Sequence, residues 1–226
     1  MNHKQKHRLH TRRGFLGRMF ASLALPALCA QRGVGAVAKK PLPQFDLKFI
    51  DGKVPLMRRS EWTDDSPRVW LLREGGKFDR ITIHHQGGPT SISREKNTVV
   101  CEIDAVYGGH KRKRYGDIAY HFIVDYAGCV WEGRSLAYEG AHVSHQNKNN
   151  LGILVLGNFE KQTPSAESLA SIDKLTKVLR GRFGIKHHRV YGHCDIGSSL
   201  CPGKNLYPHV AALRNGTLNN KHKNTT

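Results

Sequence analysis

Apolar residues along this chain occur in short alternating or continuous runs that predict five β-strands. The first run, Arg80-Ile81-Thr82-Ile83-His84, alternates between polar and apolar residues and stops at a Gly-Gly-Pro turn. Two longer runs are almost entirely apolar and predict central strands, because a strand with one solvated face would alternate. A turn at 125–128 separates one of them from a short run, which predicts a hairpin. The predicted strands cover residues 80–84, 118–124, 129–131, 151–156 and 189–191.

Two other segments carry apolar residues at helical spacing. The first helix is predicted over residues 93–107, and the Gly108-Gly109 pair is expected to end it before a basic loop at 111–114. The second is predicted to begin with Thr163 as N-cap and Pro164 as its first residue. Its apolar stripe, which ends before Gly184, consists of Leu169, Ile172, Leu175, Leu179 and Phe183.

Strands and helices are mixed along the chain without an internal repeat or linker, which predicts a single α/β domain. We place this domain at residues 58–214. A Pro-punctuated segment at 39–57 is expected to be an extended lead-in, and the polar residues 215–226 are expected to form a frayed tail.

Composition narrows the class of protein. Hydrophobic residues make up 38% of the 226, which is enough to form a core and excludes wholesale disorder. No run reaches the roughly 18 apolar residues that a membrane span needs, so stable membrane insertion is not expected. The chain has 36 Lys+Arg against 18 Asp+Glu, a net charge of +18, which makes a nucleic-acid binder one interpretation.

The first 38 residues change that interpretation. They contain seven basic residues and no acidic ones, so the rest of the chain carries 29 − 18 = +11. Arg12-Arg13 precedes Phe15-Leu16, as in the twin-arginine export signal, and Ala36-Val37-Ala38 fits a cleavage site. We therefore expect a twin-arginine signal peptide at 1–38 and a periplasmic or cell-wall location. An ordinary secretory signal and a disordered basic tail are the alternatives.

Candidate chemistry gathers near the end of the domain. His193 follows a predicted strand, and a loop containing Gly and Ser separates it from Cys201. Imidazole and thiolate are both zinc ligands, and His84, at the end of its own strand, is the natural third. Three protein ligands leave the fourth tetrahedral position open to water, which is the arrangement of a catalytic site. The alternative is that His193 forms structural hydrogen bonds and Cys201 a disulfide.

Five sequence blocks occur in an order that resembles the zinc-dependent N-acetylmuramoyl-L-alanine amidases, a family that includes phage lysozyme-type amidases and animal peptidoglycan recognition proteins. The resemblance covers roughly residues 58–213 and implies a mixed central β-sheet flanked by helices. Its most specific block is the last. The blocks are Ile81-Thr82-Ile83-His84-His85, Gly116-Asp117-Ile118-Ala119-Tyr120-His121-Phe122, Trp131-Glu132-Gly133-Arg134, Gly140-Ala141-His142 with Asn147 and Gly152-Ile153, and Gly192 to Gly203.

The resemblance implies one Zn²⁺ ion held by His84, His193 and Cys201, with water as the fourth ligand. His85 cannot share the site, because adjacent strand residues point to opposite faces. Tyr120 falls on the family's catalytic tyrosine. Ser199 stands where members carry a Lys or Thr that helps to stabilise the tetrahedral intermediate. Ser199 is therefore a candidate catalytic residue that keeps a hydroxyl donor but not the positive charge of a lysine.

The remaining blocks yield further expectations. His142 and Asn147 are expected to line the substrate groove, and Cys194 to stay outside the metal shell. Asp195 is expected to orient His193 or to cap its loop, and a plain turn role is the alternative. Glu132 is expected to be solvated surface, so the general base is not identified. The sequence leaves open whether Cys101 and Cys129 form a disulfide.

The function that the resemblance implies is hydrolysis of the amide between N-acetylmuramic acid and L-alanine in peptidoglycan or its fragments. The alternatives are a peptidoglycan-binding module without catalysis and a basic nucleic-acid binder. The export signal argues against a nucleic-acid binder. The net charge of +11 on the chain after residue 38 is instead consistent with attraction to an anionic cell-wall polymer. The oligomeric state cannot be read from the sequence.

Overall fold

The computed structural model describes residues 45–220 of the chain. The expected signal peptide at 1–38, residues 39–44 of the lead-in and residues 221–226 of the tail lie outside the described residues. Within 45–220, no helix is long and apolar enough to cross a membrane.

A six-stranded mixed sheet with the order β1-β4-β3-β5-β2-β6 forms the centre of the domain. Strands β3 and β4 pair antiparallel as the predicted hairpin, and the other neighbouring pairs are parallel. This confirms the single α/β domain with a mixed sheet. The strands are β1 (Leu56–Met57), β2 (Arg80–His85), β3 (Phe122–Val124), β4 (Val130–Glu132), β5 (Asn150–Val155) and β6 (Val190–Gly192).

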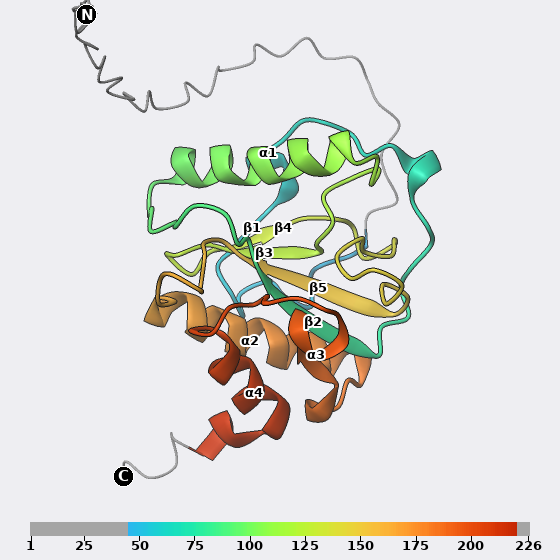
Figure 1. Cartoon of the computed structure of the whole chain (residues 1–226). Helices are drawn as coiled ribbons and strands as arrows, with labels where there is room; N and C mark the ends of the chain where they lie inside the picture. Colours follow the sequence, from blue (N-terminus) through green and yellow to red (C-terminus); the bar gives the residue numbers. More distant parts are fainter. Residues whose placement is uncertain (1–44, 221–226) are drawn as a thin grey trace, which may run out of the picture. The chain divides into compact units, whose positions relative to one another are not determined.

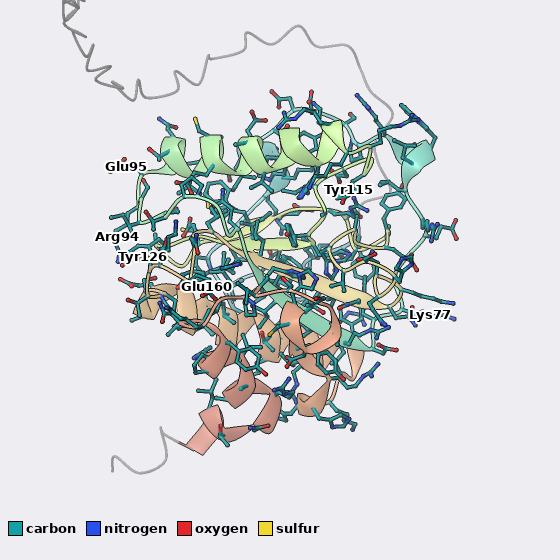
Figure 2. All side chains as sticks on the ribbon, in the orientation of Figure 1. Lys77, Arg94, Glu95, Tyr115, Tyr126 and Glu160 are labelled. Carbon is teal, nitrogen blue, oxygen red and sulfur yellow. The ribbon has the colours of Figure 1, made fainter. Side chains whose placement is uncertain are left out.

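Helices cover both faces of this sheet. Helix α1 (Lys96–Arg112) lies on one face, while α2 (Ala166–Phe183) and α4 (Tyr207–Asn215) lie on the other (Figure 1). The short helix α3 (His193–Ile196) follows β6 directly. Side chains fill the space on both sides of the sheet (Figure 2).

The alternation along β2 decides which face carries the candidate chemistry. Ile81 and Ile83 belong to the core that packs against α2 and α4. Because successive side chains of a strand point to opposite faces, Thr82 and His84 point to the other face. His84 therefore lies on the side of the sheet that faces away from α2.

The second predicted helix is largely confirmed as α2. Its buried residues include Ile172, Leu175 and Leu179 of the predicted stripe, and Gly184 ends it in the left-handed conformation. The predicted N-cap was wrong by two residues. Ser165 occupies that position, and its hydroxyl accepts a hydrogen bond from the amide of Ser168 at 3.0 Å.

Helix α1 continues through the glycine pair that was expected to end it. Its last turn makes tertiary contacts that offset the glycines: His110 Nδ1 accepts from the Ala119 amide at 3.1 Å, and Lys111 pairs with Asp65. Positive side chains are also favourable at a helix C-terminus. The basic loop expected at 111–114 is therefore partly helical.

The strand predicted at 118–124 is regular only over its last three residues, β3. The guanidinium group of Arg134 donates to the carbonyl oxygens of Asp117 and Ile118, at 3.1 and 2.7 Å. Those carbonyl groups therefore bind a side chain, and the segment before β3 is buried but irregular.

Both ends of the domain extend beyond the expected boundaries. In the lead-in, residues 48–53 form turns, Leu47 and Ile50 are buried in the core, and β1 pairs with β4. In the tail, Thr217–Asn220 forms a 3-10 helix, and Leu218 packs against the same core. Residues 48–53 of the expected extended lead-in therefore turn back on themselves, and residues 215–218 of the expected tail lie at the end of α4 and in the following 3-10 helix and pack against the core through Leu218.

Candidate metal centre

His84 and His193 are brought together by the pairing of two parallel strands. Ile83 of β2 lies opposite Gly192 of β6, so the residues that follow them stand side by side at the carboxyl ends of the strands. The two imidazole ring centroids are 4.8 Å apart. The predicted position of His193, directly after a strand, is confirmed.

Cys201 reaches the same place from the loop after α3. The Cys194 amide donates to the Cys201 carbonyl oxygen at 2.7 Å, which closes the loop, and Cys201 Sγ lies 3.6 Å from His84 Nδ1. One donor atom from each of His84, His193 and Cys201 lies within 4.8 Å of the other two. The three predicted ligands therefore form one cluster.

These donors suit a zinc ion. Zinc binds sulfur at about 2.3 Å and imidazole nitrogen at about 2.0–2.1 Å, so two such ligands at the tetrahedral angle stand about 3.5 Å apart. The 3.6 Å between Cys201 Sγ and His84 Nδ1 agrees with this separation. Two imidazoles and one thiol also leave a fourth position for a non-protein ligand.

Burial controls the protonation of the cluster. It lowers the pKa of His84 well below its usual range, with smaller contributions from His142 and His193, so the imidazole is neutral and can bind a metal. Burial also raises the pKa of the Cys201 thiol to about 12, against the opposing effect of the hydrogen bond from the His85 amide. A metal ion that bound there would have to displace the thiol proton.

His85 lies outside the cluster, as expected from strand alternation. Its Nδ1 accepts a hydrogen bond from the Phe159 amide at 3.2 Å, and its ring stacks against that of Phe159. Cys194 also lies outside the cluster and is exposed. Cys101 and Cys129 both carry thiols and do not form the disulfide that the sequence left open.

Tyr120 lies beside the cluster, with its ring centroid 5.1 Å from that of His84. Burial raises the pKa of its phenol, and the nearby Cys201 raises it further. Tyr120 is therefore an uncharged phenol at neutral pH. It can donate a hydrogen bond to an oxygen that gains negative charge.

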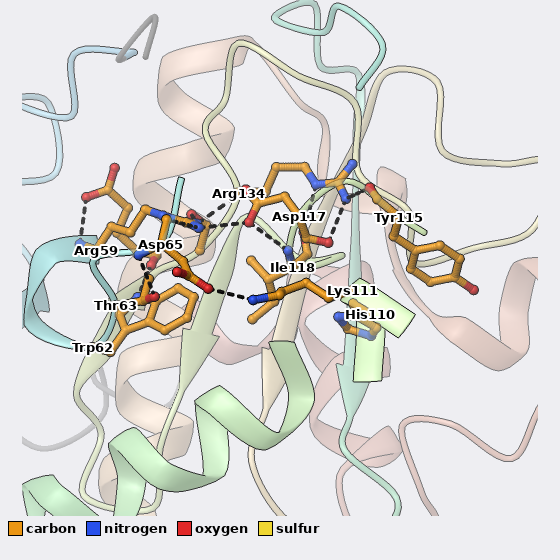
Figure 3. Close-up of polar contacts among 12 residues, drawn as sticks. Arg59, Trp62, Thr63, Asp65, His110, Lys111, Tyr115, Asp117, Ile118 and Arg134 are labelled. Atoms are coloured by element: carbon orange, nitrogen blue, oxygen red, sulfur yellow. Dashed lines mark hydrogen bonds and ion pairs between the residues drawn. The ribbon is translucent and has the colours of Figure 1, made fainter. Parts of the chain in front are cut away.

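A buried arginine holds the segment that leads to Tyr120, and Figure 3 shows its contacts with Tyr115 and Asp117. Arg134 is 3% exposed, and its guanidinium group donates to the carbonyl oxygens of Tyr115, Ile118 and Glu139 at 2.7–2.8 Å. The Arg134 amide donates to the Tyr120 carbonyl oxygen at 2.8 Å. The sequence reasoning used Arg134 only as part of a motif and missed this role.

An ion pair between Arg59 and Asp117 also supports this segment. Arg59 binds both carboxylate oxygens of the buried Asp117, at 2.9 and 3.2 Å (Figure 3). The Arg59 amide also donates to Glu132 Oε2 at 3.1 Å. Glu132 is thus partly buried and hydrogen-bonded, so its assignment to solvated surface was wrong.

The two residues expected to line the substrate groove bind each other. The amide of His142 donates to Asn147 Oδ1 at 2.8 Å. His142 is 8% exposed, and its Nδ1 lies 3.0 Å from His84 Nε2. The groove position expected for His142 is therefore wrong, because its ring packs behind a candidate ligand. Asn147 does line a cavity of about 520 Å³, together with Arg73, Glu139, His145 and Lys148.

Ser199 and Asp195 both shape the loop that carries Cys201. The Ser199 hydroxyl accepts a hydrogen bond from the Cys201 amide at 3.1 Å. Asp195 accepts from the Gly192 amide at 2.7 Å and binds Tyr207 and Arg214 of α4. Of the roles left open for Asp195, the structure shows the cap.

Comparison with known proteins agrees with this geometry. The family model for N-acetylmuramoyl-L-alanine amidase matches residues 74–204, and the chain belongs to this family. Peptidoglycan-recognition protein SD of Drosophila simulans is 29% identical over 168 residues, which cover 70% of this chain and 85% of that protein.

Solved structures share the fold. The crystal structure of Drosophila peptidoglycan recognition protein SD matches with a TM-score of 0.62 and 26% identity, over 69% of this chain and 92% of that one. An endolysin N-acetylmuramoyl-L-alanine amidase from Clostridium intestinale matches with a TM-score of 0.57 and 21% identity, over 71% of this chain and 95% of that one.

Proposed function

We propose that this protein is a zinc-dependent N-acetylmuramoyl-L-alanine amidase. It would hydrolyse the amide between N-acetylmuramic acid and L-alanine in peptidoglycan or its fragments. The observation that carries the proposal is the cluster of His84, His193 and Cys201 within 4.8 Å, in a chain of this family. Tyr120, next to His84, adds a hydrogen-bond donor.

His84, His193 and Cys201 would hold the zinc ion, which supplies Lewis acidity toward water and a carbonyl oxygen. Tyr120 would donate its phenol hydrogen to the carbonyl oxygen as negative charge develops there. Such a donor stabilises the tetrahedral intermediate most where water is excluded, and Tyr120 is partly buried beside His84. The Arg134 network would keep the phenol in place during this step.

Ser199 would add a weaker second donor. Its oxygen accepts from the Cys201 amide, so its own hydroxyl hydrogen remains available for the substrate oxygen. The contribution is smaller than that of a lysine at this position, because a hydroxyl carries no charge.

The cavity beside the 141–149 loop would bind the peptide part of the substrate. Its lining includes the cationic Arg73 and Lys148 beside Asn147, opposed by the single acid Glu139. Stem peptides of peptidoglycan carry carboxylates, so attraction to this cavity should weaken with salt. This keeps a substrate-binding role for Asn147 through the hydrogens of its side-chain amide, because its Oδ1 already accepts from the backbone amides of His142 and Val143.

The second candidate is a peptidoglycan-binding module without catalysis, since curated relatives are named as recognition proteins. The full set of three candidate ligands next to Tyr120 favours the enzyme. A module that only binds has no need of a metal cluster with an open fourth position.

The decisive experiment is digestion of purified peptidoglycan by zinc-loaded protein, with products identified by mass spectrometry. Free stem peptides that begin with L-alanine, formed only without chelator, are expected. The His193→Ala variant should lose zinc and activity, while His188→Ala, in the preceding 3-10 helix, should keep both. Undigested peptidoglycan that sediments with zinc-loaded protein would instead establish the binding module.

We also propose that residues 1–38 direct export of the folded protein to the periplasm or cell-wall space. The Arg12-Arg13 pair with Phe15-Leu16 supports this proposal, as does the lack of acidic residues in the segment.

A further inference from the structure

A chain of three hydrogen-bonding groups runs from the metal cluster into the core. His84 Nε2 lies 3.0 Å from His142 Nδ1, and His142 Nε2 lies 3.2 Å from the Asn150 carbonyl oxygen. We propose that His142 is a positioning residue that fixes the tautomer and orientation of His84, so that His84 presents a bare Nδ1 to the zinc ion. The inference rests on the zinc site of the proposed function.

The donor and acceptor roles in this hydrogen-bonded series follow from the Asn150 carbonyl oxygen at its buried end. A carbonyl oxygen can only accept, so His142 must carry its hydrogen on Nε2 in order to donate to Asn150. A neutral imidazole has one hydrogen, which leaves His142 Nδ1 as an acceptor. The Asn150 carbonyl thus sets the tautomer of His142.

The same reasoning then applies to His84. Because His142 Nδ1 can only accept, the hydrogen of His84 must lie on Nε2. His84 Nδ1 is therefore left with a free lone pair, and this atom lies 3.6 Å from Cys201 Sγ, inside the cluster. The opposite tautomer of His84 would put a hydrogen on the metal-facing atom.

Burial supports the assignment. His84 is 1% exposed and His142 is 8% exposed. Burial disfavours the charged form of an imidazole, so both rings are neutral and each has one donor and one acceptor nitrogen.

Two glycines make room for the His142 ring. A Cβ atom on Gly140 would lie 2.4 Å from the ring, and one on Gly152 would lie 2.5 Å from it. Any side chain at either position would displace the ring from His84. Asn147 fixes the backbone of the same loop by accepting from the amides of His142 and Val143.

The alternative role, contact with substrate, conflicts with these contacts. Both ring nitrogens of His142 already have partners inside the protein, and the side chain is almost entirely buried. His142 is not one of the clustered donors either, so it does not replace a ligand. Its contacts place it directly behind one.

Three variants of the full-length protein test the proposal, with zinc affinity measured by competition against a chromophoric chelator. His142→Phe fills the same space but leaves His84 Nε2 without an acceptor, so zinc affinity should fall 10- to 100-fold. His142→Gln keeps one acceptor and one donor, so it should recover part of that loss. His121→Phe is the matched control, because His121 is buried beside His142 but binds only backbone groups, of Gly152 and Tyr138.

The expected order of zinc affinity is therefore wild type and His121→Phe, then His142→Gln, then His142→Phe. Equal affinity of His142→Phe and the wild type would overturn the proposal, while zinc-dependent hydrolysis by the wild type would leave the proposed function intact. A wild-type protein that bound no zinc would overturn both. Should His142→Phe fail to fold, nitrogen NMR of the zinc-loaded wild type decides between the tautomers. A hydrogen on Nε2 of both His84 and His142 is expected. A hydrogen on Nδ1 of either residue would refute the proposed positioning role of His142.

Discussion

The backbone amide of His85 donates a hydrogen bond to Sγ of Cys201 at 3.3 Å, while its imidazole points away and accepts from the Phe159 amide. His85 thus serves the candidate site through its backbone alone. A backbone donor to sulfur favours the thiolate that a metal requires.

Substitution of the two neighbouring histidines should therefore have unequal effects. His84→Ala removes one of three candidate ligands, and the purified protein should contain little or no zinc. His85→Ala keeps the backbone amide, so it should retain near-stoichiometric zinc by elemental analysis. Equal loss of zinc from both variants would contradict the assignment of the two side chains.

Tyr120→Phe should separate catalysis from metal binding. Removal of one preorganised donor to an oxyanion costs about 100- to 1000-fold in rate. We expect a decrease of this size in peptidoglycan hydrolysis, with zinc content unchanged. Tyr115→Phe is the control, because Tyr115 stacks on His110 and should leave the rate near wild type. Similar rates for both variants would exclude a catalytic phenol.

Ser199→Ala should have a smaller effect than Tyr120→Phe, about tenfold in rate, because its hydroxyl is a weak second donor. Loss of the hydrogen bond from the Cys201 amide should also lower the free energy of unfolding by about 1 kcal/mol. Ser199→Thr keeps a hydroxyl and should restore both quantities. An unchanged rate for Ser199→Ala, with lower stability, would assign Ser199 to loop structure alone.

Stability should fall in mild acid because of His121, a buried histidine that is not one of the clustered donors. Burial lowers the pKa of His121 to about 3, against 6.5 in the unfolded chain. Above about pH 6.5 neither state binds the proton, and below it the unfolded chain binds more protons. As the pH falls from about 6.5 to 3, His121 should therefore lower the free energy of unfolding by up to about 1.4 kcal/mol per pH unit.

Denaturant unfolding from pH 7.5 to 5, with chelator present to remove zinc effects, measures this dependence. The matched variant is His121→Gln, which cannot titrate and should show a shallower loss of stability. Parallel curves for the variant and the wild type would show that His121 is not a neutral buried group.

Export should depend on the arginine pair itself rather than on charge. Arg12→Lys with Arg13→Lys keeps the charge but removes the pair, and we expect the protein to remain in the cytoplasm as uncleaved precursor. Arg8→Lys with Arg18→Lys is the matched control and should be exported normally. Cell fractionation with immunoblotting measures both, and normal export of the first variant would refute a twin-arginine signal.

Much of the fold could be predicted because local pattern and tertiary structure agree there. The stripe of α2 faces the sheet at the predicted residues, and the hairpin of β3 and β4 follows its turn. Propensity failed where side chains override it. The Gly108-Gly109 pair did not end α1, because His110 and Lys111 bind other segments beyond it.

The candidate site also has a part that the sequence predicts and a part that depends on tertiary contacts. The three clustered residues could be proposed from chemistry and motif, because His84 lies near the end of a strand, His193 follows one, and Cys201 ends a loop that contains Gly and Ser. The place of His142 could not, since it depends on a hydrogen bond to His84, 58 positions earlier. The glycines at 140 and 152 were the available signal, but their importance appears only when the ring they accommodate is seen.

The cluster also joins distant parts of the chain, because His84 and Cys201 are 117 positions apart. An unfolded chain holds these two residues close together only rarely, so zinc would bind the native state preferentially and would link β2 to the loop after α3. At a free zinc concentration 1,000 times the Kd, this linkage adds about 4 kcal/mol to the free energy of unfolding. Metal supply would then set resistance to proteolysis as well as activity, and zinc starvation would lower the abundance of the protein.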